Sequence, residues 1–304
     1  MDPCLGCTPV SVLRDLPAQL GLGRRRIATL IARGVLVRLD RYLVVGSCLV
    51  ARAQKDPRVA HRLKLDRLLR TYPECVASDE SAALVHGLPV FGLPSYAIAT
   101  RPWGAWRGGA DGRVRIKPLP AHHVCEVDGV PTTTVARTVV DLVRSATMRS
   151  AVVVGDAAMR QGLGRPALLQ MLDEVSGWTD LGRAGSVVDF LDGRAESALE
   201  SLSRVIFHEY DVPPPEPQYE IVVAGETYRV DFYWKEQRTI GEADGKVKYT
   251  GVLDPDRSPE QVLWDEKHRE DALRDDDHRF VRWTYGQMLG RTEETVARIL
   301  RRLA

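Results

Sequence analysis

The chain of 304 residues has no long apolar run. A helix needs about 20 consecutive, mostly apolar residues to cross a bilayer, and no stretch of this sequence approaches that length. The first residues, MDPCLGCTPV, also lack the charged and then apolar order of a signal peptide and the Arg-rich, Ser-rich character of a transit peptide. We therefore expect no membrane partner and a cytoplasmic location.

Cysteines are few, and they follow no regular spacing. The five cysteines are odd in number and scattered, which argues against the disulfide framework of a secreted protein. Cys4 and Cys7 form a CxxC pair, but structural zinc needs four ligands and no second closely spaced Cys or His pair follows. With 44% hydrophobic and 27% charged residues, the composition is that of an ordinary globular protein.

The charge changes sign along the chain, although the total is only +1. Residues 1–50 carry 7 basic and 3 acidic side chains, and residues 51–191 carry 18 basic and 14 acidic ones. Residues 192–304 carry 17 basic and 24 acidic side chains, a net charge of −7. A basic segment favours contact with phosphates, whereas an acidic one is a poor nucleic-acid surface unless cations neutralise it. We predict three domains with these boundaries, in an α+β or α/β multidomain chain.

The first 50 residues have the pattern of short helices followed by a hairpin. Apolar residues recur at helical spacing, and the stretch RRRIATLIARGVLVRLDRYLVV predicts a helix that opens with three arginines, a stop at Gly34 and two strands. In a helix-turn-helix the second helix enters the major groove with its N-terminal residues toward the bases. The candidate DNA-binding residues are Arg24, Arg25, Arg26, Arg38 and Arg41. The alternative is a solvated basic face on a helix that packs elsewhere.

The segment from Val10 to Gly46 resembles the winged-helix domain of AbiEi-type antitoxins, the DNA-binding autorepressors of type IV toxin-antitoxin systems. The resemblance rests on the periodicity and on the stretch RxxIATLIARGVLVRLDRYLVV. It implies a winged helix-turn-helix fold, DNA as a partner and a cognate toxin as a candidate partner. One position departs from the family, because Arg41 is followed by Tyr42 where the family wing has glycine.

Residues 51–191 predict an α+β connector domain. We expect a basic amphipathic helix at 58–72, a short helix after Ser78 and a small sheet between residues 95 and 130. The stretches GVPTTTVARTVVDLVRS and AVVVGDAAM then predict two further helices. The ARTVVDL and GDAAMRQG pieces resemble the region that follows the winged helix in AbiEi-like proteins.

Two residue pairs of the connector are polar. Arg137 and Asp141 lie four residues apart on one predicted helix, which indicates a surface ion pair. His122 and His123 are expected on a strand, where neighbours point to opposite faces, so at most one of them could line a site. We therefore interpret both histidines as structural.

Acidic residues recur in the last domain at spacings that bring them together. The helix AESALESLSRVIFHEY carries Glu200 near the edge of its apolar face, and the proline-rich connector DVPPPEPQ follows. The strand ETYRVDFYW contains Asp231. The next strand, RTIGEADGKVKY, places Glu242, Asp244 and Lys246 at intervals of two, so all three share one face.

Carboxylates aligned on one strand face repel each other, so the cluster needs compensation. A divalent metal supplies it, because Mg²⁺ takes oxygen ligands and commonly binds one or two carboxylates together with phosphate oxygens. The candidate metal ligands for Mg²⁺ or Mn²⁺ are Asp231, Glu242 and Asp244. The alternative is a polar strand edge or a salt-bridged hairpin.

The segment from about residue 195 to residue 289 resembles the PD-(D/E)xK nuclease superfamily, and more closely its very-short-patch-repair-like branch. The carriers are RVDFYW, GEADGKVKY and WDEKHREDALRDDDHRFVRW, in this order. The resemblance implies a restriction-endonuclease-like α/β domain in which Asp231 and Glu242 bind metal, Glu200 assists and Lys246 is the motif lysine. It also implies a basic residue on the later helix near the scissile phosphate, for which the candidates are Lys267 and Arg269.

The position of the motif lysine stays open. If Glu242 is the motif acid, the residue two positions later is Asp244; if Asp244 is the motif acid, Lys246 takes the lysine position. A degenerate, purely structural site is the third alternative.

Two functions therefore compete. The first is a DNA-binding, Mg²⁺-dependent deoxyribonuclease in defence or repair, and the second is an AbiEi-type antitoxin or transcriptional repressor with an inactive nuclease-like domain. RNA as a substrate is a weaker option, because we identify no pattern of a stacking platform for bases.

Overall fold

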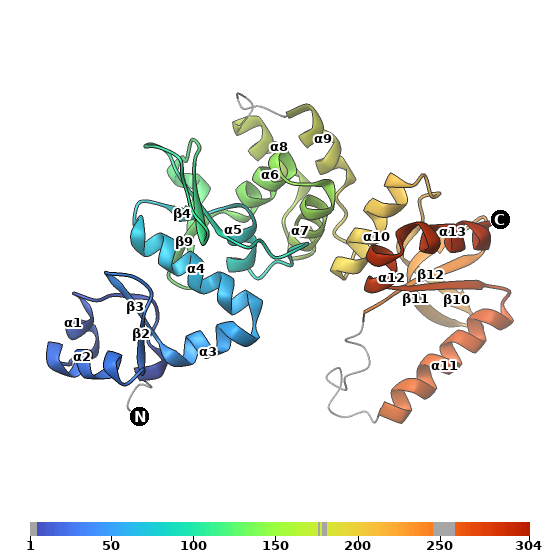
Figure 1. Cartoon of the computed structure of the whole chain (residues 1–304). Coiled ribbons are helices and arrows are strands. Elements are labelled where there is room, and N and C mark those ends of the chain that lie inside the picture. The colour runs from blue at the N-terminus through green and yellow to red at the C-terminus, as the bar shows by residue number, and fades with distance from the viewer. Residues whose placement is uncertain (1–4, 176, 178–180, 246–258) are drawn as a thin grey trace. The chain divides into compact units, whose positions relative to one another are not determined.

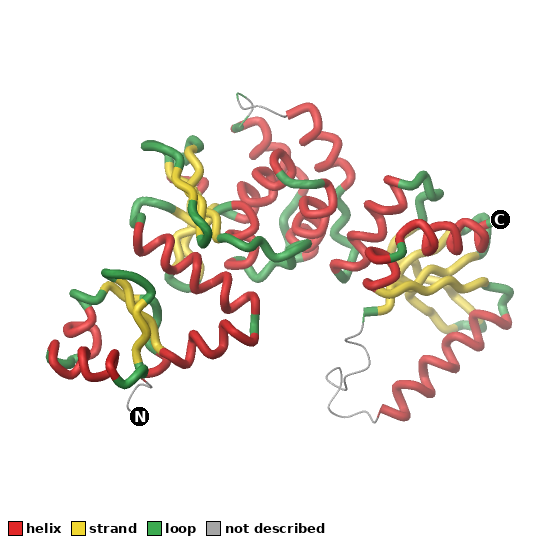
Figure 2. Tube along the Cα trace, viewed as in Figure 1, coloured by secondary structure: helices red, strands yellow, loops and turns green. Residues whose placement is uncertain are grey.

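The computed structural model describes residues 5–175, 177, 181–245 and 259–304. In this part of the chain, the strands form three separate sheets of three, six and four strands, and helices alternate with them along the sequence (Figures 1 and 2). The chain is thus an α+β multidomain protein. None of its described helices combines the length and the apolar character that a membrane span requires.

The chain divides into two units, each built from two segments. Unit 1 contains Met1–Ser150 and Leu163–Gly185, and unit 2 contains Ala151–Gly162 and Ser186–Ala304. The chain passes between the units three times: within α7 (Met148–Arg160), after Gly162, and within α9 (Leu181–Phe190).

The first part of unit 1 consists of short helices and a small sheet. In chain order it contains η1 (Leu5–Cys7), β1 (Ser11–Val12), α1 (Leu16–Leu20), α2 (Arg24–Ala32), β2 (Leu36–Arg38) and β3 (Leu43–Gly46). The strands pair antiparallel in the order β1-β3-β2. Gly21 ends α1 at φ +64, and this left-handed conformation allows the tight turn into α2. Ile27 and Leu30 of α2 pack against Leu36 and Val44 of the sheet. The helices and strands predicted for this segment are confirmed.

The second part of unit 1 is a six-stranded sheet with helices. Its elements are α3 (Ser47–Lys55), α4 (Pro57–Thr71), β4 (Val76–Ala77), α5 (Asp79–Val85), β5 (Ala97–Arg101), β6 (Arg107–Gly108), β7 (Gly112–Ile116), η2 (Ala121–His123), β8 (Val124–Val127), β9 (Val130–Thr133), α6 (Val135–Ser145) and α8 (Arg165–Glu174). The strand order is β6-β7-β5-β4-β9-β8. Leu65 and Leu68 of α4 pack on the sheet beside Ala99 and Val114. The Thr134 side chain accepts a hydrogen bond from the Arg137 backbone and so caps α6.

Unit 2 contains a four-stranded sheet between helices. Its elements are α10 (Ala198–Glu209), β10 (Glu216–Val223), β11 (Glu226–Trp234), β12 (Thr239–Asp244), α11 (Pro259–Asp275), β13 (Arg279–Thr284), α12 (Tyr285–Gly290) and α13 (Thr292–Leu303). The order is β10-β11-β12-β13, and β13 alone runs parallel to its neighbour, after the crossover through α11.

The two faces of this sheet are covered by different helices (Figure 1). Phe207 of α10 packs against the rings of Phe232, Trp234 and Trp283 on one face. Leu273 of α11 joins a separate cluster on the other face, with Tyr233, Ile240 and Phe280. Because side chains alternate along a strand, Asp231 and Glu242 lie on the α11 side.

Candidate functional site

Arginines from α2 and from the β2–β3 hairpin line one groove in unit 1. The groove has a volume of about 970 Å³, and Arg24, Arg38 and Arg41 are among its lining residues, together with Arg14 and Arg70. Arg24 begins α2, whose N-terminus carries the positive end of the helix dipole. The sequence-predicted residues Arg25 and Arg26 are exposed on α2 but do not line this groove.

An aspartate, Asp40, shapes the turn of the β2–β3 hairpin. The Asp40 carboxylate accepts hydrogen bonds from the backbone N–H groups of Tyr42 and Leu43, at 2.8 and 2.9 Å. Tyr42 is 63% exposed, and the Arg41 guanidinium lies 5.4 Å from the centre of its ring. The turn thus adds a cation and an aromatic ring to the lining of the groove.

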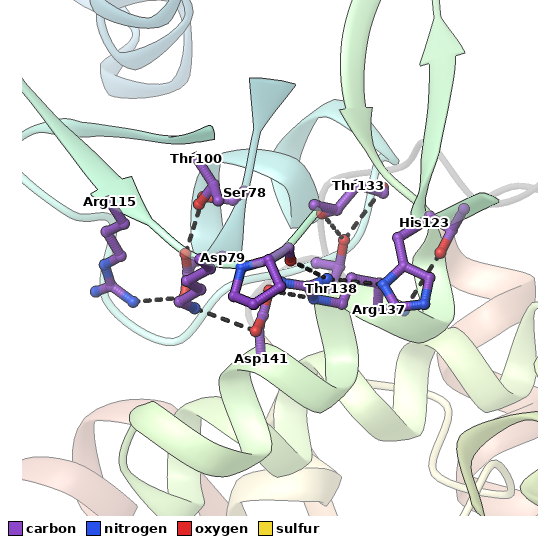
Figure 3. A network of polar contacts seen from close by, with 12 residues as sticks. Ser78, Asp79, Thr100, Arg115, His123, Thr133, Arg137, Thr138 and Asp141 are labelled. Carbon is purple, nitrogen blue, oxygen red and sulfur yellow. Dashed lines mark hydrogen bonds and ion pairs between the residues drawn. The ribbon is translucent and has the colours of Figure 1, made fainter. Parts of the chain in front are cut away.

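Buried charged groups connect α5, β7 and α6 in unit 1 (Figure 3). Asp79 is fully buried and adopts φ +52, a conformation that non-glycine residues rarely take. Its carboxylate accepts hydrogen bonds from the Ser78 hydroxyl at 2.9 Å and from Arg115 at 2.6 Å. Lys117 lies 3.4 Å from Asp79 and 3.1 Å from Asp141, and so links the two carboxylates.

The predicted surface location of the Arg137–Asp141 pair is wrong. The two side chains do form an ion pair at 2.9 Å, but both are completely buried. Arg137 also donates to the Pro118 carbonyl and to the His123 ring. The spacing of four residues identified the pair, whereas its burial depends on segments that pack over α6.

The prediction that His122 and His123 lie on a strand and point apart is also wrong. Both belong to η2, and both Nε2 atoms lie within 3 Å of one Glu174 oxygen, at 2.9 and 2.7 Å. Hydrogen bonds from His123 first, and then from His122, lower the pKa of Glu174 to about 2. In the described part of the chain, these are the three potential metal ligands that lie within 4.8 Å of one another.

A metal ion does not fit this histidine pair. Arg137 can only donate, so Nδ1 of His123 accepts its hydrogen bond and the ring proton sits on Nε2, which donates to Glu174. A metal at Nε2 would move that proton to Nδ1, against the N–H of Arg137. The cluster therefore acts as a hydrogen-bonded link between η2 and α8.

In unit 2, Asp231 and Glu242 face each other across two strands. Phe232 pairs with Gly241 in the antiparallel register, so the next residues outward, Asp231 and Glu242, are opposite. The Asp231 carboxylate accepts a hydrogen bond from the Ala243 backbone at 2.9 Å. Two predicted ligands thus come together, on adjacent strands.

Glu242 is neutralised by two arginines. Its Oε1 atom lies 2.8 Å from Arg269 of α11, and its Oε2 atom lies 3.8 Å from Arg282 of β13. Arg269 also binds Glu266 at 2.7 Å, and Arg282 binds Glu270 at 2.8 Å. Burial raises the pKa of Glu242, and the charge of Arg269 opposes this effect.

Not every other predicted site residue contacts the pair of Asp231 and Glu242. Glu200 is buried, but its carboxylate bonds to Ser197 and to Gln218, at 2.7 and 2.9 Å, so it closes the N-terminus of α10. Asp244 lies two residues after Glu242 on β12, and its side chain has no hydrogen-bond or ion-pair partner among the described residues. Lys267 is exposed on α11, and Lys246 lies outside the described residues, as does Cys4.

Arg282 is a site residue that was not predicted from the sequence. Its pairing with Glu242 depends on β13 lying beside β12, where Glu242 and Arg282 are register partners. The alternation of FVRWTY, with an arginine between apolar neighbours, was the available signal.

Comparisons with known proteins give relatives without a stated activity. No family model matches the chain. The uncharacterized proteins MT2308 and Rv2248, from two strains of Mycobacterium tuberculosis, are each 36% identical to it over 127 residues, which is 41% of this chain. The matched segment spans about half of those relatives, 47% of their length. The crystal structure of the RV2827C protein from Mycobacterium tuberculosis is 17% identical, with a TM-score of 0.41, and the match covers 64% of this chain and 76% of that one.

Proposed function

We propose that the chain is a DNA-binding protein that holds duplex DNA through the arginine groove of unit 1. The observation that carries the proposal is the shared groove: Arg24 from α2 and Arg38 and Arg41 from the hairpin line the same depression. The order of two helices followed by a hairpin supports a winged helix, in which the second helix and the wing contact DNA together. Each arginine that neutralises a phosphate releases counterions and adds affinity.

Binding of a short labelled duplex, followed by fluorescence anisotropy in EDTA, tests this proposal. We expect Arg24→Gln/Arg38→Gln/Arg41→Gln to lower the affinity by roughly tenfold or more. The matched control is Arg33→Gln/Arg52→Gln/Arg58→Gln, which removes the same charge from exposed positions of unit 1 outside the groove. Equal losses in both triple variants would contradict the proposal.

A second candidate function is metal-dependent hydrolysis of DNA phosphodiesters in unit 2. It is favoured by Asp231 and Glu242, which offer hard oxygen ligands from facing strands, and by Asp244 two residues further along β12. This donor set suits Mg²⁺, which would activate water and neutralise charge on the phosphate. Arg269 and Arg282, beside Glu242, are the groups that could bind phosphate oxygens.

The ion pairs of Glu242 favour the competing proposal, an AbiEi-type repressor with an inactive nuclease-like domain. The sequence led us to expect a divalent metal ion that offsets the negative charge of the carboxylates. Arg269 already offsets the charge of Glu242. A carboxylate held in this way can serve the fold alone.

Plasmid cleavage with Mg²⁺, Mn²⁺ or EDTA separates these alternatives. A hydrolase should cleave only with metal, and should lose activity in Asp231→Asn and in Glu242→Gln. Glu226→Gln is the control, because Glu226 is exposed at the far end of β11. If no protein cleaves while duplex binding in EDTA is retained, the repressor is the better account.

A further inference from the structure

Two tryptophans project from the loop and hairpin that follow β5. Trp103 and Trp106 are 60% and 63% exposed, although tryptophan normally buries most of its surface. Arg107, the first residue of β6, and Arg113 of β7, the register partner of Gly108, are exposed as well. We infer that this segment, residues 101–113, binds unpaired bases of single-stranded DNA by stacking on the two indole rings.

Both rings are held in place by the protein. The Arg101 guanidinium lies 5.5 Å from the centre of the Trp103 ring, and Arg101 is itself buried and bonded to Glu74 and to the Ala105 carbonyl. The Trp106 ring lies directly over Gly108, where an added Cβ would overlap the ring atoms Cη2 and Cζ2. Fixed rings lose little conformational entropy when a base stacks on them.

The surroundings of the rings carry positive charge. A groove of about 290 Å³ runs beside the hairpin, and Lys64, Arg67 and Arg107 line it together with a single acid, Asp111. Arg67 pairs with Asp111 at 2.8 Å and with Asp40 at 3.3 Å, so three basic side chains meet two acidic ones and one positive charge remains in excess. This charge complements the phosphates that connect stacked bases in a strand.

Exposed, supported rings select an unpaired strand rather than a duplex. In a duplex the base faces are covered by neighbouring base pairs, whereas a single strand can place its bases on aromatic side chains. The inference rests on the proposed DNA binding by unit 1, and it adds a contact of a different kind in the same unit. The stretch WGAWRGG, with two tryptophans three residues apart, was its signal in the sequence, and the expectation that no stacking platform is present overlooked it.

Anisotropy of a labelled oligothymidylate, with the full-length protein, tests the inference. We expect Trp103→Ala/Trp106→Ala to weaken binding of the single strand by roughly tenfold for each ring, with duplex affinity unchanged. Trp264→Ala, which removes a tryptophan that is 61% exposed on α11, is the control and should bind the strand as the wild type does.

Gly108→Ala is a second variant that keeps both rings. The added methyl group displaces Trp106, so single-strand affinity should fall although no aromatic residue is removed. Unchanged single-strand binding in both the double variant and Gly108→Ala would overturn the inference, and tighter binding of an RNA of the same sequence would overturn its assignment to DNA. The proposed function is tested separately, by duplex binding of Arg24→Gln/Arg38→Gln/Arg41→Gln. If this variant loses duplex binding alone, its single-strand binding still tests the inference.

Discussion

The Glu242 carboxylate lies 2.8 Å from the guanidinium of Arg269, which reaches it from α11. The same Arg269 nitrogen lies 2.7 Å from Glu266. This contact separates the two proposals for unit 2, because a hydrolase must offer the Glu242 carboxylate to a cation, whereas a repressor can keep it in the ion pair.

Loss of Arg269 should destabilise unit 2. Arg269→Met leaves the buried Glu242 with only Arg282, at 3.8 Å, and we expect the free energy of unfolding to fall by about 3 kcal/mol. Thermal and urea unfolding measure this change. The control is Arg274→Met, since Arg274 is 52% exposed and pairs with Glu270 at the surface, where the loss should stay below about 1 kcal/mol.

Mg²⁺ should partly replace Arg269 if the carboxylates can hold a cation. Added Mg²⁺ then raises the melting temperature of Arg269→Met more than that of the wild type, because binding to the folded state alone stabilises it. The additional change Asp231→Asn should abolish this response. An equal response in all three proteins would contradict a metal site at these carboxylates.

Glu242 should make stability depend on pH. Burial raises the pKa of its carboxyl group and the charge of Arg269 only partly offsets this, so the folded chain binds the proton more readily than the unfolded chain does. Its contribution to stability is therefore fully present below the ordinary pKa of glutamate and is lost as the pH rises through the raised value. Compared with Glu242→Gln, the wild type should lose melting temperature as the pH rises above the ordinary pKa of glutamate toward the raised value. A relative gain by the wild type over this range would show that the pKa is lowered instead.

The buried Arg137–Asp141 pair should contribute far more than a surface pair. Arg137→Met leaves Asp141 buried beside Lys117 alone, and we expect a loss of about 3 to 5 kcal/mol in unfolding free energy. In the exposed pair of Arg229 and Glu196, Arg229→Met should cost less than about 1 kcal/mol. Partial recovery in Arg137→Met/Asp141→Leu would show that the unpaired charge causes the loss.

Local sequence patterns were sufficient for most secondary structure. Apolar periodicity identified α6 and α10, whereas the caps that Thr134 and Ser197 form at their N-termini are seen in the structure alone. Ser78, the expected cap of α5, makes no capping hydrogen bond with its side chain. Alternation identified β11, and with it the strand position of Asp231. These features depend on neighbours within a few residues, which a sequence shows directly.

Contacts between distant segments could not be predicted in the same way. The pairing of Glu242 with Arg282 needs β13 beside β12, and the approach of His123 to Glu174 needs η2 beside α8. The clustering of Asp231 and Glu242 was accessible because a hairpin joins their strands. DNA, metal and toxin binding stay predictions.

The dependence of duplex binding on salt tests the central proposal most directly. The slope of log K against log salt concentration should be shallower in Arg24→Gln/Arg38→Gln/Arg41→Gln, by about 0.9 for each phosphate contact removed. The control Arg33→Gln/Arg52→Gln/Arg58→Gln should keep the slope of the wild type. If the groove variant keeps that slope as well, the arginine groove does not hold the phosphates and the account of unit 1 is wrong.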